Sequence, residues 1–130
     1  MTIQDMVREM CTAFGQDVHD ELHKPDQGVR GLRLLLLSEE FREYMDAEKS
    51  TNPVDIADAL GDMLVVIYGT AAAYGIDLDA VVREIHASNM SKIRPDGTVL
   101  RDEHGKVQKP DTYRPPNLAP ILGNLGAWSA

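Results

Sequence analysis

The stretch that decides the fold is PVDIADALGDMLVVIYGTAAAYG, residues 53–75. Asn52 directly before it is a favoured N-cap, the proline that opens it suits a first helical turn, and Gly75 is a common helix terminator. Of the 23 residues from 54 to 76, 16 are apolar, and none from 63 to 76 carries a charge. The sequence therefore predicts a helix that must be covered on nearly every side.

The uncharged part of this helix is too short to span a membrane. A membrane span needs about 20 apolar residues, whereas 14 uncharged residues follow Asp62, and Asp58 lies one turn further upstream. We therefore expect no membrane partner. Since a 130-residue chain with three other helices has too little surface to cover this one, we expect an obligate homo-oligomer, a homodimer or a tetramer.

Hydrophobic periodicity and stop signals predict three further helices. The first opens on Thr2 and Asp5, which have the spacing of a capping box. The three cover residues 3–14, 29–48 and about 77–92. Together with the apolar helix they predict an all-α fold, a four-helix bundle.

The C-terminal part of the chain has a different pattern. Turn dipeptides at residues 96–97 and 104–105 predict a small hairpin, and four prolines from residue 110 on exclude a long helix. Apolar residues near the end predict a strap against the bundle. We expect one domain, residues 1–130, with a helical core over about 1–93 and a hairpin and strap over 94–130.

Composition restricts the class of partner and the compartment. Thirteen Lys+Arg against 21 Asp+Glu give a net charge of −8, which disfavours binding to nucleic acid. The lone Cys11 excludes a disulfide framework and a multi-cysteine metal site. No basic segment followed by an apolar run opens the chain, so we expect a cytoplasmic protein.

Acidic residues recur at helical spacing on two of the predicted helices. Glu39, Glu40 and Glu43 share one half of their helix, a pattern that is also common on solvated helix faces. Asp58 and Asp62 are more informative, because they lie in the most apolar helix and no Lys or Arg is close to them in the sequence. An ionised carboxylate buried without a partner destabilises the fold by several kcal/mol.

A facing acidic patch together with a hard divalent cation would satisfy these carboxylates. Oxygen-only ligands suit Mg²⁺, with Mn²⁺ as the alternative. A di-iron carboxylate bundle needs Glu-x-x-His on two helices. None of the four histidines lies three residues after a glutamate, which argues against that class.

Asn89 and Lys92 lie three residues apart at the end of the fourth predicted helix. By themselves they are explained by C-terminal capping and by the helix dipole. Beside a metal–phosphate site, Lys92 would contact phosphate and Asn89 the sugar or base. No Walker or Rossmann glycine loop occurs in the chain.

Three segments resemble a known family. They are SEEFRE (38–43), DALGDM through NMSK (58–92) and DGTVLRDEHGKVQKPDTYRPPNL (96–118). In this order they are similar to the MazG-like, all-α nucleoside triphosphate pyrophosphohydrolases. The branch is the phosphoribosyl-ATP pyrophosphohydrolase-like one, which includes dUTPase-like members, and the similarity covers residues from about 30 to 118.

The resemblance implies roles for the acidic residues. The family holds Mg²⁺ with E-E-x-x-E on one helix and E-x-x-D on the next, which match Glu40, Glu43 and Asp62 here. Ala59 stands where the family has the glutamate, so Asp58, one residue earlier, is the substitute ligand that we expect.

The resemblance also implies the reaction, Mg²⁺-dependent hydrolysis of a (deoxy)nucleoside triphosphate, such as dUTP or another house-cleaning substrate, to the monophosphate and pyrophosphate. Glu39 would orient or deprotonate the attacking water, and Tyr113 and Arg114 in the tail would close the site. The alternatives are phosphoribosyl-ATP hydrolysis, a catalytically impaired nucleotide-binding protein, and a plain oligomerising helical bundle.

Overall fold

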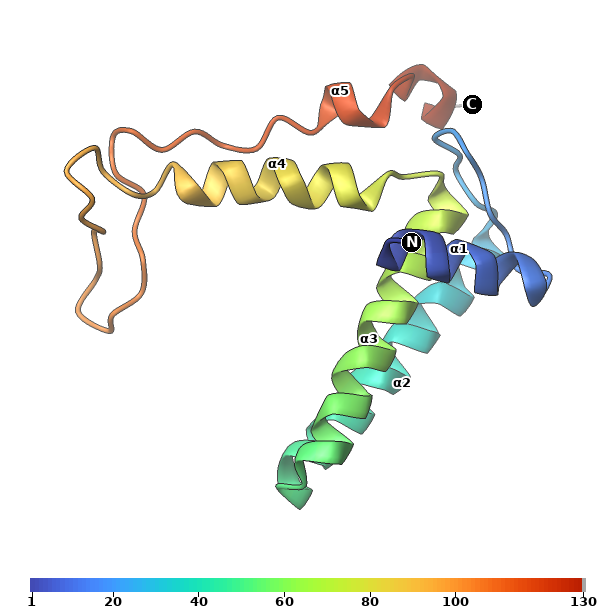
Figure 1. Ribbon diagram of the computed structural model, residues 1–130. Helices are drawn as coiled ribbons and strands as arrows, with labels where there is room; N and C mark the ends of the chain where they lie inside the picture. Colours follow the sequence, from blue (N-terminus) through green and yellow to red (C-terminus); the bar gives the residue numbers. More distant parts are fainter. Residues whose placement is uncertain (130) are drawn as a thin grey trace. The chain divides into compact units, whose positions relative to one another are not determined.

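The computed structural model describes residues 1–129 as an all-helical chain (Figure 1). The four long helices lie where the sequence predicts them, which confirms the all-α class. A short fifth helix interrupts the tail and was not predicted. The helices are α1 (Ile3–Ala13), α2 (Gln27–Ser50), α3 (Pro53–Tyr74), α4 (Leu78–Met90) and α5 (Ala119–Leu122), and a 3₁₀ turn follows at Leu125–Ser129.

The chain divides into two compact units. The first, called here the hairpin unit, contains Met1–Asp77 and the C-terminal residues from Gly123 on. The second, called the strap unit, contains Leu78–Leu122, with α4, α5 and the segment between them. Within the hairpin unit, α1 and α2 both pack against α3.

Local capping determines where the helices of the hairpin unit begin. Thr2 and Asp5 form the predicted capping box, each side chain accepting a hydrogen bond from the other residue's backbone N–H. Asp26 accepts from the N–H of Val29 at 3.0 Å, and Asn52 from the N–H of Val54 at 2.9 Å. These bonds satisfy backbone donors that the first helical turn leaves unpaired.

The C-terminus of α3 is covered by the loop that joins α1 to α2. The backbone N–H of His19 donates to the carbonyl of Ala72, and that of His23 donates to the carbonyl of Tyr74, both at 2.9 Å. Gly75 ends the helix with φ of +65°, and a Cβ there would lie 1.8 Å from the carbonyl oxygen of Glu21. This position therefore requires glycine for two reasons: its φ is positive, and there is no room for a Cβ.

One residue of the predicted strap, Trp128, packs against α3 within the hairpin unit, as we expected. The Trp128 ring stacks on Tyr74 with ring centroids 5.5 Å apart.

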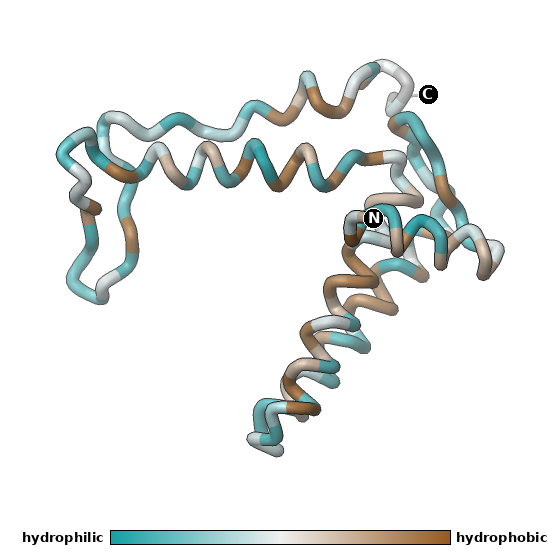
Figure 2. The backbone as a smooth tube through the Cα atoms, viewed as in Figure 1, coloured by the Kyte–Doolittle hydropathy of each residue, from teal (hydrophilic) through white to brown (hydrophobic). Residues whose placement is uncertain are grey.

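The core of the chain consists mainly of small side chains. Cys11 is the largest fully buried side chain among the described residues, and the three consecutive alanines at 71–73, near the end of α3, are also buried. Large apolar side chains of α2 and α3 remain exposed. Figure 2 shows the hydrophobic stretches of these two helices in brown. Leu34 is 73% exposed, Phe41 49% and Leu60 50%.

Within the described residues, α3 is the one helix long and apolar enough to cross a membrane by length and composition. An 18-residue window of this helix has a mean hydropathy of 1.5, and 33% of that window is buried in the chain. Core helices of soluble proteins pass the same test, so the absence of a membrane partner stays a prediction.

The sequence predicted a small hairpin with strands in the tail, and the strands of this prediction are wrong. The described residues contain no β-strand, and the segment after α4 forms two isolated antiparallel bridges, Ile93 with Val99 and Arg101 with Val107. Two tight turns lie close together in the chain, one at Gly97 and one at Gly105. Each turn is flanked by only one bridge. Two short pairs with no covering layer have too few contacts to become a ladder.

Candidate metal site

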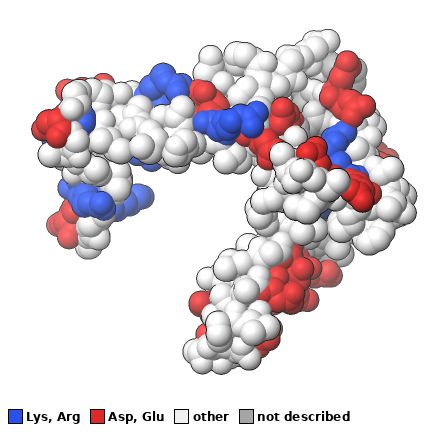
Figure 3. Space-filling view, in the orientation of Figure 1, with Lys and Arg blue, Asp and Glu red and all other residues white. Residues whose placement is uncertain are grey.

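The acidic residues of α2 and α3 meet between the two helices of the hairpin. Glu40, Glu43 and Asp62 each offer a carboxylate oxygen, and these oxygens all lie within 4.8 Å of one another. We call these three residues the acid cluster. Figure 3 shows acidic side chains gathered along this hairpin. The structure therefore brings together three of the four metal ligands that the sequence predicts.

Burial and mutual repulsion raise the pKa values of two members of the acid cluster. The pKa of Glu40 is raised first by burial and then by the negative charge of Glu43. The pKa of Asp62 is raised first by burial, and then by the charges of Asp58 and Glu43. No Lys or Arg among the described residues forms an ion pair with the cluster. The cluster is therefore an uncompensated negative site.

The acid cluster fits a hard divalent cation. Glu40 Oε2 is buried and has no hydrogen-bond partner, so the fold leaves an acceptor unsatisfied at the place where the carboxylates converge. All donors are oxygens, and Mg²⁺ prefers carboxylate oxygen ligands. Glu40, Glu43 and Asp62 are the residues that would hold such an ion.

Asp58, the fourth predicted ligand, is exposed and lies outside the acid cluster. With Glu43 it lines a pocket of about 270 Å³ whose other acids are Asp46 and Asp55. Ala59 lines the same pocket and is itself 4% exposed. There is thus open space directly beside the position where the resemblance places a glutamate, and Asp58 borders that space.

Glu39, the predicted catalytic residue, is exposed on α2 next to Glu40 and is not one of the three converging carboxylates. Its negative charge contributes to the raised pKa of Glu40. An exposed carboxylate at the edge of the cluster is in a position to contact water, as its predicted role requires.

Three of the four predicted substrate-binding residues meet in the strap unit. The Lys92 ammonium donates to Asn89 Oδ1 at 3.1 Å and lies 6.0 Å from the centre of the Tyr113 ring. Lys109, which sequence reasoning missed, lies 5.0 Å from the same ring. The sequence signal that could have indicated Lys109 is its spacing of four residues from Tyr113, in a segment without strand or helix.

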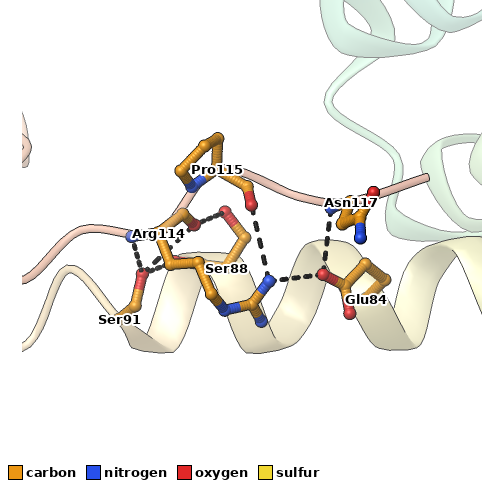
Figure 4. A network of polar contacts seen from close by, with 6 residues as sticks. All are labelled: Glu84, Ser88, Ser91, Arg114, Pro115 and Asn117. Atoms are coloured by element: carbon orange, nitrogen blue, oxygen red, sulfur yellow. Dashed lines mark hydrogen bonds and ion pairs between the residues drawn. The ribbon is translucent and has the colours of Figure 1, made fainter. Parts of the chain in front are cut away.

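Arg114, the fourth predicted substrate-binding residue, forms its contacts within the strap unit (Figure 4). Its Nη1 forms an ion pair with Glu84 Oε1, and Glu84 also accepts from the backbone N–H of Asn117 at 3.0 Å. The Ser88 hydroxyl donates to the carbonyl of Arg114 at 2.8 Å. The Asn117 bond first, and then Arg114, lower the pKa of Glu84. This network fixes the strap along α4.

The all-α fold and a carboxylate cluster between two of its helices define a class of protein, the MazG-like superfamily of helical pyrophosphohydrolases. Within this class, the model of the phosphoribosyl-ATP pyrophosphohydrolase family matches residues 7–89, and the chain belongs to that family. Its members hydrolyse phosphoanhydride bonds of nucleotides, usually with a divalent metal.

The chain is also similar to the uncharacterized protein L479 of Acanthamoeba polyphaga mimivirus. The two are 43% identical over 68 residues, which is 52% of this chain and 26% of the relative. The matched segment thus spans about a quarter of the length of that relative.

Proposed function

We propose that this chain hydrolyses a (deoxy)nucleoside triphosphate, with dUTP or another house-cleaning nucleotide as the substrate, to the monophosphate and pyrophosphate with the help of Mg²⁺. The acid cluster is the observation that carries the proposal. Its buried, unsatisfied oxygen and raised pKa values mark a negative site that needs a cation, and it lies in a chain that belongs to a family of pyrophosphohydrolases.

Each acidic residue has a separate part in the proposed reaction. Glu40, Glu43 and Asp62, with Asp58 beside them, would hold Mg²⁺, for which Mn²⁺ substitutes. Bound there, the ion neutralises charge that develops on phosphate oxygens and lowers the pKa of water. Glu39 accepts a proton from the attacking water, whose oxygen bonds to the α-phosphorus as the bond to the bridging oxygen breaks and pyrophosphate leaves.

The strap unit supplies the proposed substrate contacts. Lys92 carries the positive charge for a phosphate, and Asn89, held by it at 3.1 Å, presents an amide to the sugar or base. Tyr113 and Arg114 are the two further proposed substrate contacts. Glu84 holds Nη1 of Arg114, which leaves its Nη2 for that contact.

Phosphoribosyl-ATP hydrolysis is the second candidate, because the matching family model describes that activity. A panel of dUTP, dCTP, the other nucleoside triphosphates and phosphoribosyl-ATP with Mg²⁺, read by pyrophosphate release, separates the two. No release from any of them would contradict both. Nucleotides that raise the melting temperature without being hydrolysed would then indicate a catalytically impaired binding protein, and no such effect a plain helical bundle.

We also propose that the protein is a homodimer or a tetramer. The exposed apolar side chains of α2 and α3, such as Phe41 and Leu60, need a cover that the described part of the chain does not supply. Analytical ultracentrifugation at micromolar concentration should show a species of at least two chains. A compact species of 14.4 kDa would contradict this.

A further inference from the structure

The hairpin unit contains a second charged site, of the opposite sign. A cavity of about 170 Å³ between α2 and α3 is lined by Arg30, Arg33, Thr70 and Tyr74 with three apolar side chains, and by no carboxylate. The unit as a whole has fifteen Asp+Glu against six Lys+Arg. Two of its six cations therefore line one cavity from which all of its acids are absent.

Arg33 is buried without a counter-charge. It is 8% exposed, its Nε donates to Thr70 Oγ1 at 3.1 Å, and its Nη2 donates to the carbonyl of Val66 at 2.9 Å. No carboxylate of the described residues lies within 4.0 Å of the guanidinium. Burial lowers the pKa of Arg33, but a guanidinium stays charged at neutral pH. A buried charge without a partner of opposite sign is unfavourable and rare.

The facing helix makes room for this guanidinium. A Cβ at Gly69 would lie 2.4 Å from Arg33 Nη2, so no larger residue fits at that position of α3 unless the arginine moves. A glycine inside a helix makes it less stable than an alanine would. The α2–α3 pair thus accommodates a buried arginine at the expense of helix stability.

The rest of the cavity is apolar and lies in line with the acid cluster. Its apolar walls are Leu34, Leu37 and Ile67. Arg33 and Glu40 are seven residues apart on α2, which places them on the same helix face about 10 Å apart along the axis. A ligand there meets cationic and apolar groups together.

We propose that the Arg30–Arg33 cavity is an anion subsite that binds a phosphate monoester, with the nucleoside-type body of the ligand against the apolar walls. The two guanidiniums supply the charge-assisted hydrogen bonds that such a phosphate accepts. The phosphate has two sources. It is either the phosphate monoester of phosphoribosyl-ATP, with the triphosphate at the acid cluster, which rests on the second candidate of the proposed function, or that of a separate mononucleotide.

The first experiment measures binding without metal. Inorganic phosphate and AMP are titrated into the full-length protein in EDTA at constant ionic strength, and the arginine Nε–H signals are followed by NMR. We expect both probes to shift the signals of Arg30 and Arg33. Arg30→Gln and Arg33→Met should weaken AMP binding by at least about tenfold, whereas the matched control Lys49→Gln, on the exposed end of α2, should not.

Two results would overturn the subsite: no signal shift with either probe, or equal AMP affinity in the wild type and both arginine variants. The latter would show that the guanidinium is satisfied by Thr70 and Val66 alone. The Arg30 side chain is half-buried and forms no hydrogen bond or ion pair with the described residues, so Arg30→Gln keeps the test valid if Arg33→Met does not fold.

The second experiment distinguishes the sources of the phosphate. If it belongs to the substrate, Arg30→Gln should lower kcat/KM for phosphoribosyl-ATP by at least about tenfold more than it lowers kcat/KM for dUTP, which carries no second phosphate. If it belongs to a separate mononucleotide, AMP should change the rate of the wild type without competing with substrate. Either result supports the subsite. Pyrophosphate release from no substrate, with the AMP-induced shifts intact, would overturn the proposed function and leave the subsite standing.

Discussion

The Glu84 network of the strap unit and the facing surfaces of α2 and α3 in the hairpin unit treat charged side chains in opposite ways. In the strap unit, Glu84 is matched by Arg114 and by the backbone of Asn117, so its charge is fully used within the fold. In the hairpin unit, Glu40 has a buried oxygen without a partner, and Arg33 is buried without an acid. The first arrangement stabilises the local structure by itself. The second leaves charge of either sign available to a ligand.

This difference separates structural from functional charge. A paired carboxylate such as Glu84 has a lowered pKa, whereas the crowded and partly buried Glu40 and Asp62 have raised ones. Groups whose environment opposes their charged form are concentrated at sites that bind metals or substrates. We therefore expect substitutions in the acid cluster to act on function and those in the Glu84 network to act on stability.

The largest effect is expected for Glu43→Gln. It keeps the size of the side chain but removes one charge from the acid cluster, so Mg²⁺ should no longer raise the melting temperature, while stability without metal is kept or increased. Pyrophosphate release should fall by more than about 100-fold. Glu48→Gln, the same change at an exposed position of α2, is the control. A full metal response of Glu43→Gln, measured by thermal shift, would remove the acid cluster from the metal site.

A smaller loss is expected for Asp58→Ala. If Asp58 substitutes for the glutamate that Ala59 replaces, turnover per folded molecule should fall by about tenfold or more. The double change Asp58→Ala, Ala59→Glu should recover part of this loss, because the pocket beside Ala59 has space for the longer carboxylate. Turnover normalised to folded protein is the measurement. Unchanged turnover with lowered stability would make Asp58 a structural acid.

A double-mutant cycle between Arg33 and Gly69 tests whether the buried guanidinium requires a glycine at the facing position of α3. In the Arg33→Met background, Gly69→Ala should stabilise the protein by about 1 kcal/mol, the difference in helix propensity. In the wild type the new Cβ collides with the guanidinium, so this gain should be absent. Urea unfolding of the four proteins gives the coupling free energy. Additive effects would show that the guanidinium moves aside freely.

The smallest effect is expected for Glu84→Gln and appears only as a pH dependence. The pKa of Glu84 is lowered below its usual value of 4.5 in the folded protein. Its contribution is therefore complete above pH 4.5 and is lost as pH falls through the folded pKa. The protection factor of the Asn117 amide, which compares its hydrogen-exchange rate with the intrinsic rate at the same pH, should rise above this range in the wild type and not in the variant. Identical pH profiles of the two proteins would contradict the view that the charge of Glu84 stabilises the local structure. Mg²⁺ binding should be the same in the wild type and in the variant.

Short-range signals explain why the helices could be predicted from the sequence. The bonds that begin α1 and α3 join residues at most three positions apart, such as Thr2 with Asp5 and Asn52 with Val54. The tail was predicted less well for the same reason. Its turn dipeptides form the expected turns, but whether a turn extends into strands depends on a covering layer that no local pattern describes.

The sequence by itself determined the four long helices, the acids that two of them share, and the family, because periodicity, caps and motif order are properties of neighbouring residues. Only the tertiary structure decided which acids converge, leaving Asp58 outside the group of Glu40, Glu43 and Asp62. It alone joined Arg33 to Thr70, 37 residues away, and Arg114 to Glu84, 30 residues away. Such contacts depend on the register in which elements pack, since a change of one residue in a helix rotates a side chain by about 100°.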